Sequence, residues 1–550
     1  MSKEHSESDP CLSLEQKIGL MIWAPFYGCR KWYESREFLR QREMLRKGLI
    51  GGVVITGGEL YETATQVYDM QQNLELPLVV AAEVENGLGS LLREGTHFPA
   101  NMAFGATRSG EYGFLAGKIT AREAGAVGIN LVFGPTCSRP GAGLPEGLPK
   151  VRSYGEKLHL VTRLSLAFFK GVQDGGAKSA PRYFPGAAIL HTGEISGPKW
   201  LHHMRKLLVD TELSIYEMLT QSSMEALVVD WREIPDLETG KPVLSFTNRH
   251  LLEIFLREVV DYNGIIISPN LSDKVHAGRL LDKDILVSAV SAGVDVLAGA
   301  PEPDMVLRTL CDAVVQEKIP LSRIDKACGR IIEFRKKLKR TNPGAFRPEE
   351  IDKLVANPAN LEVADRVAED SITLLRDKKG YLPLDPAEHR TLLNLSFTAK
   401  FELAMDKYLD EALRNTFDRV ITRQIDSLVS PSRLDEAWEE TRNAGVILCA
   451  MFTNLPPEFS AHGFSPTQVE FIQSLIQEET PLIMASFGDP RTITLFPDID
   501  CYICLYSDCP ASQRALVSEL FGDIVMPVKG KLPINLDTNL PYGFGLDLTS

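Results

Sequence analysis

The sequence has little cysteine, no long hydrophobic run and no block of basic residues. Nine cysteines occur in 550 residues at irregular intervals, so we expect no disulfide framework. No apolar stretch approaches the roughly 20 residues that span a bilayer, which argues against a membrane-spanning helix. The first residues, MSKEHSESDP, are polar and acidic and do not resemble a secretory signal peptide. We therefore expect a cytoplasmic protein.

The chain also has fewer basic than acidic residues. The chain has 59 Lys and Arg residues against 73 Asp and Glu residues, which gives a formal net charge of −14. Nucleic acids and anionic membranes attract clustered Lys and Arg, so we expect neither as a partner. Apolar residues make up 44% of the chain and charged residues 24%, a balance that predicts a globular protein with a large buried core.

Three cysteines lie close together in CYICLYSDC, at Cys501, Cys504 and Cys509. A metal or redox site would need a second pair of ligands or a helix start nearby, and the sequence offers neither. We interpret the three residues as small apolar side chains in and after a buried strand. Because no HExxH or phosphate-loop pattern occurs either, we expect no metal and no organic cofactor.

Short apolar, β-branched segments alternate with helix-length segments over the first 300 residues. Several lack strict alternation of apolar and polar residues, which is typical of parallel strands covered on both faces. Eight such strands with helices between them predict a (β/α)8, TIM-like barrel in an α/β protein. The predicted strands are 18–25, 50–55, 76–83, 127–135, 177–186, 226–231, 264–270 and 292–299.

A second series of apolar strands follows a stretch rich in proline, glycine and charge. We expect the barrel domain to span residues 1–340, a linker 341–360 and a second domain 361–550. Helical patterns separate the strands of this second domain, which predicts a smaller parallel α/β sandwich. Its predicted strands are 391–397, 444–452, 481–488 and 500–507.

Motifs along nearly the whole chain resemble glycoside hydrolase family 3, which includes β-N-acetylglucosaminidases and β-glucosidases. LPLVVAAEVENG resembles the family's IPLxIAxDxEGG, VRSYG resembles xRSFG, RYFPG resembles KHFPG, and AGVDVLAG resembles AGxDxLL. Near the end of the chain, GKLPINL and YGFGL resemble GKLPVxL and GxGL. The resemblance implies a TIM-like barrel, a sandwich domain and a β-glycoside pocket at the carboxyl ends of the barrel strands.

The family's nucleophile is the residue in which this chain departs most from the pattern. Retaining β-glycosidases attack the anomeric carbon with a carboxylate, which this family places at the end of the seventh strand in a Ser-Asp-Asp sequence. The present chain reads Ser268-Pro269-Asn270. Proline has no side-chain nucleophile and Asn270 keeps only an amide oxygen, so we predict that the standard retaining mechanism is lost.

The acid/base position is altered as well. In N-acetylglucosaminidase-type members an Asp-x-His pair follows KHFPGHG, and an ungapped match puts Gly193 and Ile195 there. His191 and Glu194 are nearby substitutes, although a histidine in such a position is more often an ordinary loop residue than an acid/base. Where the family has Lys-His, this chain has Arg182 and Tyr183, which retain a cation but lose the imidazole.

Other predicted sugar contacts are kept or modified. The family's sugar-binding Asp becomes Glu83, followed by Glu85, while Arg152 of VRSYG is unchanged. Asp230 takes the place of a family His and is followed by Trp231 and Arg232, a carboxylate, an indole and a guanidinium at one strand end. These three residues suit a polar-aromatic sugar site, but Asp230 could instead form a structural ion pair with Arg232 or Arg182.

Three hypotheses follow for the function. On the first hypothesis, the chain is a catalytically impaired family homologue that binds a sugar-derived ligand. On the second, it is an O-glycosyl hydrolase whose catalytic groups lie at other positions, for which Asp230, Glu83 and His191 are the candidates. Alternatively it is a structural or partner-binding protein whose barrel mouth is filled by side chains such as Tyr183, Leu91 and Trp231. The predicted partner is a small sugar or glycoside, and the oligomeric state is left open. The predicted binding residues are Arg152, Arg182, Tyr183, Glu83, Glu85, Trp231, Arg232 and Asn270.

Overall fold

The chain forms two compact units, each built from more than one segment. The computed structural model describes residues 12–72, 74–140, 148–186, 211–236, 239–272, 282–338, 348–385, 389–399, 405–453, 463–521 and 528–547. The first unit comprises Met1–Glu85, Ala121–Pro135 and Val172–Leu354, and the second comprises Asn86–Thr120, Thr136–Gly171 and Val355–Ser550.

Eight strands close a barrel, as predicted. Six pair in the order β10-β1-β2-β3-β4-β5, and β6 pairs in parallel with β9. Parallel bridges from Phe184 to Val229 and from Ile267 to Val296 join these two sheets into a ring. The strands are β1 (Ile22–Gly28), β2 (Gly52–Gly58), β3 (Val79–Ala82), β4 (Leu131–Thr136), β5 (Lys178–Arg182), β6 (Ala226–Val228), β9 (Ile265–Ile267) and β10 (Leu297–Ala298).

The barrel strands are buried on both faces, which explains why their sequences do not alternate. All residues of β3, β4, β6 and β9 are buried. Their small and β-branched side chains, such as the Ile265–Ile267 run, fill the barrel interior on one side and contact helices on the other. The fifth strand has the weakest sequence pattern because it contains Pro181, which has no N–H for the strand ladder.

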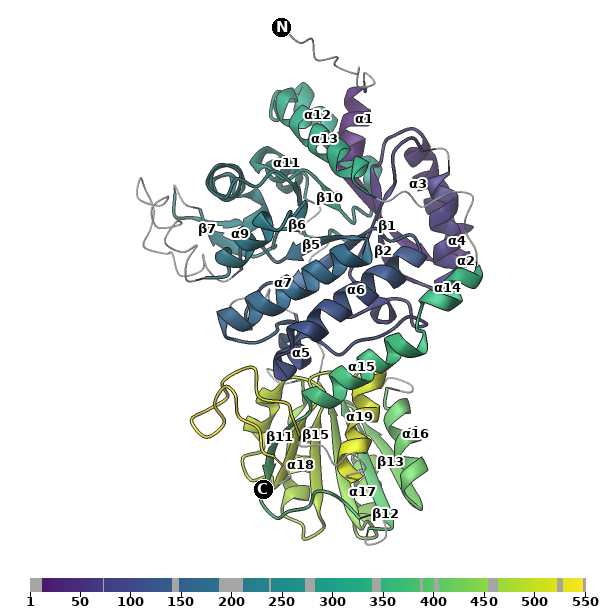
Figure 1. Ribbon diagram of the computed structural model, residues 1–550, viewed down its shortest axis with the longest axis vertical. Coiled ribbons are helices and arrows are strands. Elements are labelled where there is room, and N and C mark those ends of the chain that lie inside the picture. Colours follow the sequence, from purple (N-terminus) through teal and green to yellow (C-terminus); the bar gives the residue numbers. More distant parts are fainter. Residues whose placement is uncertain are drawn as a thin grey trace. The chain divides into compact units, whose positions relative to one another are not determined.

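Helices and short turns connect the barrel strands. α1, α12 and α13 lie together in Figure 1. A capping box between Ser13 and Gln16 fixes the start of α1, and Asp282 caps α11. Between β6 and β9 the chain forms a short antiparallel pair, β7 (Glu233–Pro235) and β8 (Pro242–Leu244), and a π-helix, η5 (His250–Val259). The other elements are α1 (Leu14–Leu20), α2 (Arg30–Tyr33), α3 (Arg36–Arg46), α4 (Leu60–Gln71), α9 (Leu213–Gln221), η4 (Ser245–Thr247), α11 (Lys283–Ala292), α12 (Pro303–Val315), α13 (Leu321–Lys336) and α14 (Pro348–Leu354).

The second unit contains a six-stranded sheet in the order β11-β16-β15-β14-β12-β13. Every pairing is parallel except that of β11 with β16, so one edge strand departs from the all-parallel expectation. Its strands are β11 (Thr373–Asp377), β12 (Thr391–Thr398), β13 (Arg419–Ile425), β14 (Val446–Phe452), β15 (Leu482–Ser486) and β16 (Cys501–Cys504), and its helices are η1 (Leu88–Ser90), α5 (Asn101–Thr107), η2 (Lys150–Arg152), α15 (Pro358–Ser371), α16 (Lys407–Thr416), α17 (Pro431–Thr441), α18 (Pro466–Ile476), η6 (Pro490–Leu495) and α19 (Pro510–Phe521). Helices α6 (Gly110–Ala126) and α7 (Leu158–Gly175) contain residues of both units.

Cysteines in this sheet have the structural role that we predicted. Cys501 and Cys504 lie in β16 and are buried, as is Cys509 after it. Burial raises the pKa of all three thiols, so they stay protonated and unreactive at neutral pH. Among the described residues, no group of three or more His, Cys, Asp or Glu side chains is arranged to hold a metal ion.

Candidate functional site

Two glutamates and an arginine meet at the carboxyl ends of β3 and β5, the two strands that flank β4 in the barrel. Glu83 and Glu85 follow β3, and Arg182 is the last residue of β5. The Arg182 Nη1 atom lies 2.6 Å from Glu83 Oε2, and its Nη2 atom lies 3.0 Å from Glu85 Oε1. The side chains of Arg182 and Glu85 are 3% exposed, whereas that of Glu83 is 33% exposed. Glu83 is therefore the member of this triad that a ligand can reach most easily.

Electrostatics hold the triad together. Burial disfavours the Arg182 guanidinium, but the carboxylates of Glu85 and Glu83 outweigh this and raise the pKa of Arg182 above its ordinary value. A buried guanidinium with two carboxylate partners is costly to disrupt, because removing the cation leaves two negative charges close together. The sequence predicted these residues individually as sugar contacts but did not predict that they bind one another.

A glycine that the sequence analysis overlooked makes room for Glu85. Gly134 in β4 has φ +146°, and a Cβ atom there would lie 2.9 Å from Glu85 Cβ and 3.1 Å from its Oε2 atom. The hydroxyl of Ser179 in β5 donates to the Gly134 carbonyl at 2.6 Å, which fixes this backbone. Only a residue without a side chain fits this close approach. The one available sequence signal was the Gly-Pro pair in VFGP.

Aromatic rings connect the triad to the end of β6. The Arg182 guanidinium lies 5.1 Å from the centre of the Tyr183 ring, and Tyr183 meets Trp231 edge-to-face with ring centres 5.7 Å apart. Tyr183 is buried and Trp231 is half-buried. The structure thus brings together the predicted residues of β3, β5 and β6 within the first unit.

Asp230 is fully buried and forms an ion pair with Arg232. Its carboxylate also accepts a hydrogen bond from the Arg232 backbone N–H at 3.1 Å. Burial raises the pKa of Asp230, while the charge and hydrogen bonds of Arg232 act in the opposite direction. Of the two partners considered from the sequence, Arg232 and Arg182, the structure pairs Asp230 with Arg232.

Pro269, which the sequence resemblance aligns with the family's nucleophile, is buried just beyond β9. Its neighbour Asn270 uses its amide oxygen locally, because this oxygen accepts hydrogen bonds from the Ser272 N–H at 3.1 Å and the Ser272 hydroxyl at 2.8 Å. Ser268 donates to the Pro269 carbonyl at 2.8 Å and accepts from Ala298 N–H at 3.0 Å. These hydrogen bonds fix the backbone beyond β9. Residues 268–272 contain no carboxylate.

Three further predicted residues, Arg152, His191 and Leu91, lie outside the described part of the first unit. Arg152 ends η2 in the second unit, where its carbonyl accepts a hydrogen bond from the Asn101 side chain at 2.8 Å. His191 lies outside the described residues, so its role as acid/base stays a prediction. Leu91, a candidate for filling the barrel mouth, follows η1 and also belongs to the second unit.

Among the helices that the structure describes, none is long and apolar enough to cross a membrane.

Comparison with known proteins places these features in a family. The model of the glycosyl hydrolase family 3 N-terminal domain matches residues 13–334. A β-N-acetylglucosaminidase/β-glucosidase of Cellulomonas fimi is 22% identical over 357 residues, and β-hexosaminidase A of Pseudoalteromonas piscicida is 24% identical over 377 residues. Each match covers 62% of this chain and 62% of the relative, so the chain spans less than two thirds of either protein.

Solved structures support the same fold. β-Glucoside phosphorylase BglX bound to 2FGlc superposes with a TM-score of 0.77 at 19% identity, covering 96% of this chain and 95% of the other. A family 3 β-N-acetylglucosaminidase from Paenibacillus sp. str. FPU-7 gives a TM-score of 0.76 at 23% identity, covering 96% and 99%. Because the family model matches more than half of this chain, the chain belongs to glycoside hydrolase family 3.

Proposed function

We propose that this protein binds a β-glycoside-type sugar at the carboxyl end of its barrel without hydrolysing it by the family's retaining mechanism. The observation that carries the proposal is Pro269 just beyond β9, where the sequence resemblance places the family's nucleophile. A glycosyl-enzyme intermediate requires a side-chain oxygen that can attack the anomeric carbon, and proline has none. The names of the relatives favour N-acetylglucosamine or glucose as the sugar.

The residues around this position suit sugar recognition. Glu83 has an accessible carboxylate that would accept hydrogen bonds from sugar hydroxyls, and Arg182 fixes its orientation. Trp231 is half-buried and would present an apolar ring to the C–H face of a sugar. A few oriented polar groups beside an aromatic surface are the usual composition of a small-molecule site.

Turnover and binding test this proposal together. We expect the purified protein to release no nitrophenol above the buffer blank from nitrophenyl β-N-acetylglucosaminide or β-glucoside. We also expect calorimetry to detect binding of N-acetylglucosamine or glucose, weakened at least tenfold in Glu83→Gln, since a hydrogen bond to a charged group contributes about 1.5–3 kcal/mol. Absence of any sugar binding would favour the structural role with a filled barrel mouth.

A relocated active site is the second candidate, favoured by the raised pKa of the buried Asp230. Perturbed carboxyl groups in a barrel site are typical of general acids. An inverting hydrolase would pair Asp230 with a base such as Glu83, with about 6.5–9.5 Å between the carboxyl groups. Release of nitrophenol that disappears in Asp230→Asn, but persists when the exposed Glu233 is changed to Gln, would establish this function and refute the first.

A further inference from the structure

The contacts of β1 show which of its side chains point into the barrel. Phe26 packs edge-to-face against Phe38 of α3, with ring centres 6.0 Å apart. A Cβ atom at Gly28 would meet the Thr63 side chain of α4. Both positions therefore face the helices outside the barrel. Because successive side chains of a strand point to opposite faces, Tyr27 between them points toward the barrel interior at the carboxyl end of β1.

The two following strands continue this position as a row. The strand register pairs Phe26 with Ile55 of β2, and Ile55 with Ala82 of β3. Paired residues of neighbouring strands point to the same face of a sheet, and so do the residues that come next on each strand. The row that results across the barrel mouth is Tyr27, Thr56 and Glu83. Neighbouring strands lie about 4.8 Å apart, so the two ends of the row are attached about 10 Å apart.

All three members of this row are accessible. Tyr27 is 47% exposed, the Glu83 side chain is 33% exposed, and Thr56 between them is exposed as well. Trp23, four residues before Tyr27 on the same strand, is by contrast fully buried. The row is thus the open end of the barrel interior, and it joins the accessible carboxylate of Glu83 to an aromatic ring.

A glycine holds the Tyr27 ring in place. Gly57 has φ +144°, and a Cβ atom there would lie 2.7 Å from Cε2 and 3.3 Å from Cδ2 of the ring. The ring therefore lies directly against the backbone of β2, where any side chain would displace it. An exposed aromatic ring that is supported by backbone offers a flat apolar surface to a ligand.

Thr56 supplies a polar group between the ring and the carboxylate. Its hydroxyl donates to the Phe26 carbonyl at 3.1 Å, which fixes the position of the oxygen. The lone pairs of this oxygen can accept a hydrogen bond from a ligand hydroxyl. A carboxylate, a hydroxyl and an aromatic ring in one row form an amphipathic surface, which is the kind that a chain of neutral sugars requires.

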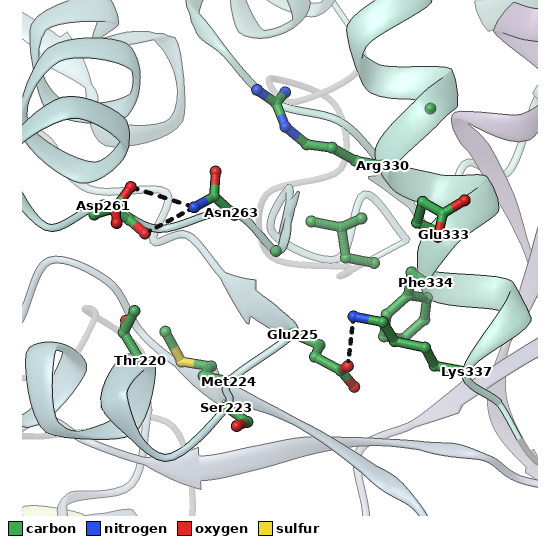
Figure 2. Close-up of a pocket in the computed structure, with 13 residues that line it drawn as sticks. Thr220, Ser223, Met224, Glu225, Asp261, Asn263, Arg330, Glu333, Phe334 and Lys337 are labelled. Carbon is green, nitrogen blue, oxygen red and sulfur yellow. Dashed lines mark hydrogen bonds and ion pairs between the residues drawn. The ribbon is translucent and has the colours of Figure 1, made fainter. Parts of the chain in front are cut away.

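The opposite end of the barrel has a different chemistry. A pocket of about 540 Å³ lies there, bounded by Glu225 before β6 and by Gly264 before β9. Figure 2 shows Lys337 in this pocket reaching Glu225, at a distance of 2.9 Å, and Arg330 of the same wall pairs with the buried Asp295 at 3.1 Å. These charged groups already bind one another, so the neutral and aromatic row at the carboxyl end is better suited to a sugar.

We propose that a second sugar ring stacks on Tyr27, so that the site takes a β-linked disaccharide in preference to a single sugar. Placing the first ring at Glu83 rests on the proposed function. A second ring linked to the first then extends along the row, past Thr56, to Tyr27 two strands away. The C–H face of this second ring covers the exposed tyrosine, and one of its hydroxyls donates to the Thr56 oxygen.

Calorimetry with matched sugars tests the proposal. The probes are glucose with cellobiose, and N-acetylglucosamine with N,N′-diacetylchitobiose. We expect the disaccharide to bind about tenfold more tightly than its monosaccharide, since covering the Tyr27 ring removes apolar area from water. Tyr27→Ala should reduce the disaccharide affinity to that of the monosaccharide, whereas Tyr27→Phe, which keeps the ring, should retain the difference. Tyr408→Ala is the matched control, because this tyrosine of α16 is 40% exposed and lies in the second unit.

The outcomes separate this proposal from the proposed function. A wild-type protein that binds the monosaccharide, and binds the disaccharide no more tightly, would overturn the role of Tyr27 and leave sugar binding at Glu83 intact. A Tyr27→Ala protein that keeps the preference for the disaccharide would overturn that role too. If the wild type bound neither sugar of either pair, both proposals would fail together.

Discussion

At the scale of residues, the proposed loss of the retaining mechanism depends first on Pro269. Pro269 lies two residues beyond the end of β9, and local hydrogen bonds hold Ser268 before it and Asn270 after it. The backbone here is ordered by these contacts, so the strand end can accept a carboxylate without rebuilding the loop. If Pro269 replaces the family's nucleophile as proposed, a substitution at this position should supply the carboxylate.

Pro269→Asp should regain the first half of the retaining reaction. With dinitrophenyl β-glucoside or β-N-acetylglucosaminide, the leaving group needs no protonation, so the absent acid/base does not prevent attack. We expect one equivalent of dinitrophenol and a protein heavier by one glycosyl unit in mass spectrometry. Pro269→Asn is the control of matched size, and it should give neither. A silent Pro269→Asp protein that still binds sugar would show that the sugar is bound in a geometry unsuited to attack.

Gly134 is the residue on which the position of Glu85 depends. Gly134→Ala would place a methyl group 2.9 Å from Glu85 Cβ at φ +146°, so we expect a loss of about 2–4 kcal/mol in the free energy of unfolding. Gly125→Ala is the control, because its Cβ would meet nothing within 4 Å in α6. That change should be neutral or stabilise by about 0.5–1 kcal/mol. Urea denaturation measures both, and equal effects of the two would contradict this account.

At the scale of elements, the sequence predicted the eight barrel strands and four strands of the second sheet because these segments are short, apolar and bounded by turns. It missed β13, whose sequence RVITRQI is largely half-exposed at a sheet edge, and β11, which pairs antiparallel with β16. The Glu83–Arg182–Glu85 triad was not predictable either, since side-chain pairing between strands far apart in sequence leaves no local pattern.

Helix starts provide a test of local stabilisation at this scale. Ser465 begins α18 with a capping box, whereas Ser430 begins α17 without a side-chain cap, and both are followed by proline. Ser465→Ala should cost about 1 kcal/mol in the free energy of unfolding, because it leaves the Gln468 N–H without its acceptor. Ser430→Ala should cost a few tenths at most. Thermal or urea unfolding would refute this if the order were reversed.

At the scale of the whole molecule, acid should destabilise the fold partly through His97. Burial lowers its pKa from 6.5 to about 4, so below pH 6.5 the unfolded chain takes up a proton that the folded chain does not. The contribution of His97 to the free energy of unfolding is therefore fully present above pH 6.5 and is lost as the pH falls toward 4. At pH 4.5 this loss amounts to about 2 kcal/mol.

Substitution isolates this contribution. His97→Gln should remove about that much of the pH dependence between pH 7 and 4.5, as measured by urea denaturation at each pH. His159→Gln, at an exposed histidine, should unfold with the pH dependence of the wild type. If all three proteins lost stability in parallel, His97 would not be responsible for the acid sensitivity.

The division of the chain into interleaved segments has a consequence for its synthesis. Apart from Leu375 in β11, the later side chains that join Met102, Ala106 and Val151 in the core of the second unit come from β12 and the elements after it, which begin at Thr391. Since 240 residues separate Val151 from Thr391, a ribosome needs roughly 10–50 s to supply the partners of these early residues. During that interval the nascent chain exposes apolar side chains that the barrel alone cannot bury, and a chaperone that holds this segment would raise the yield of folded protein.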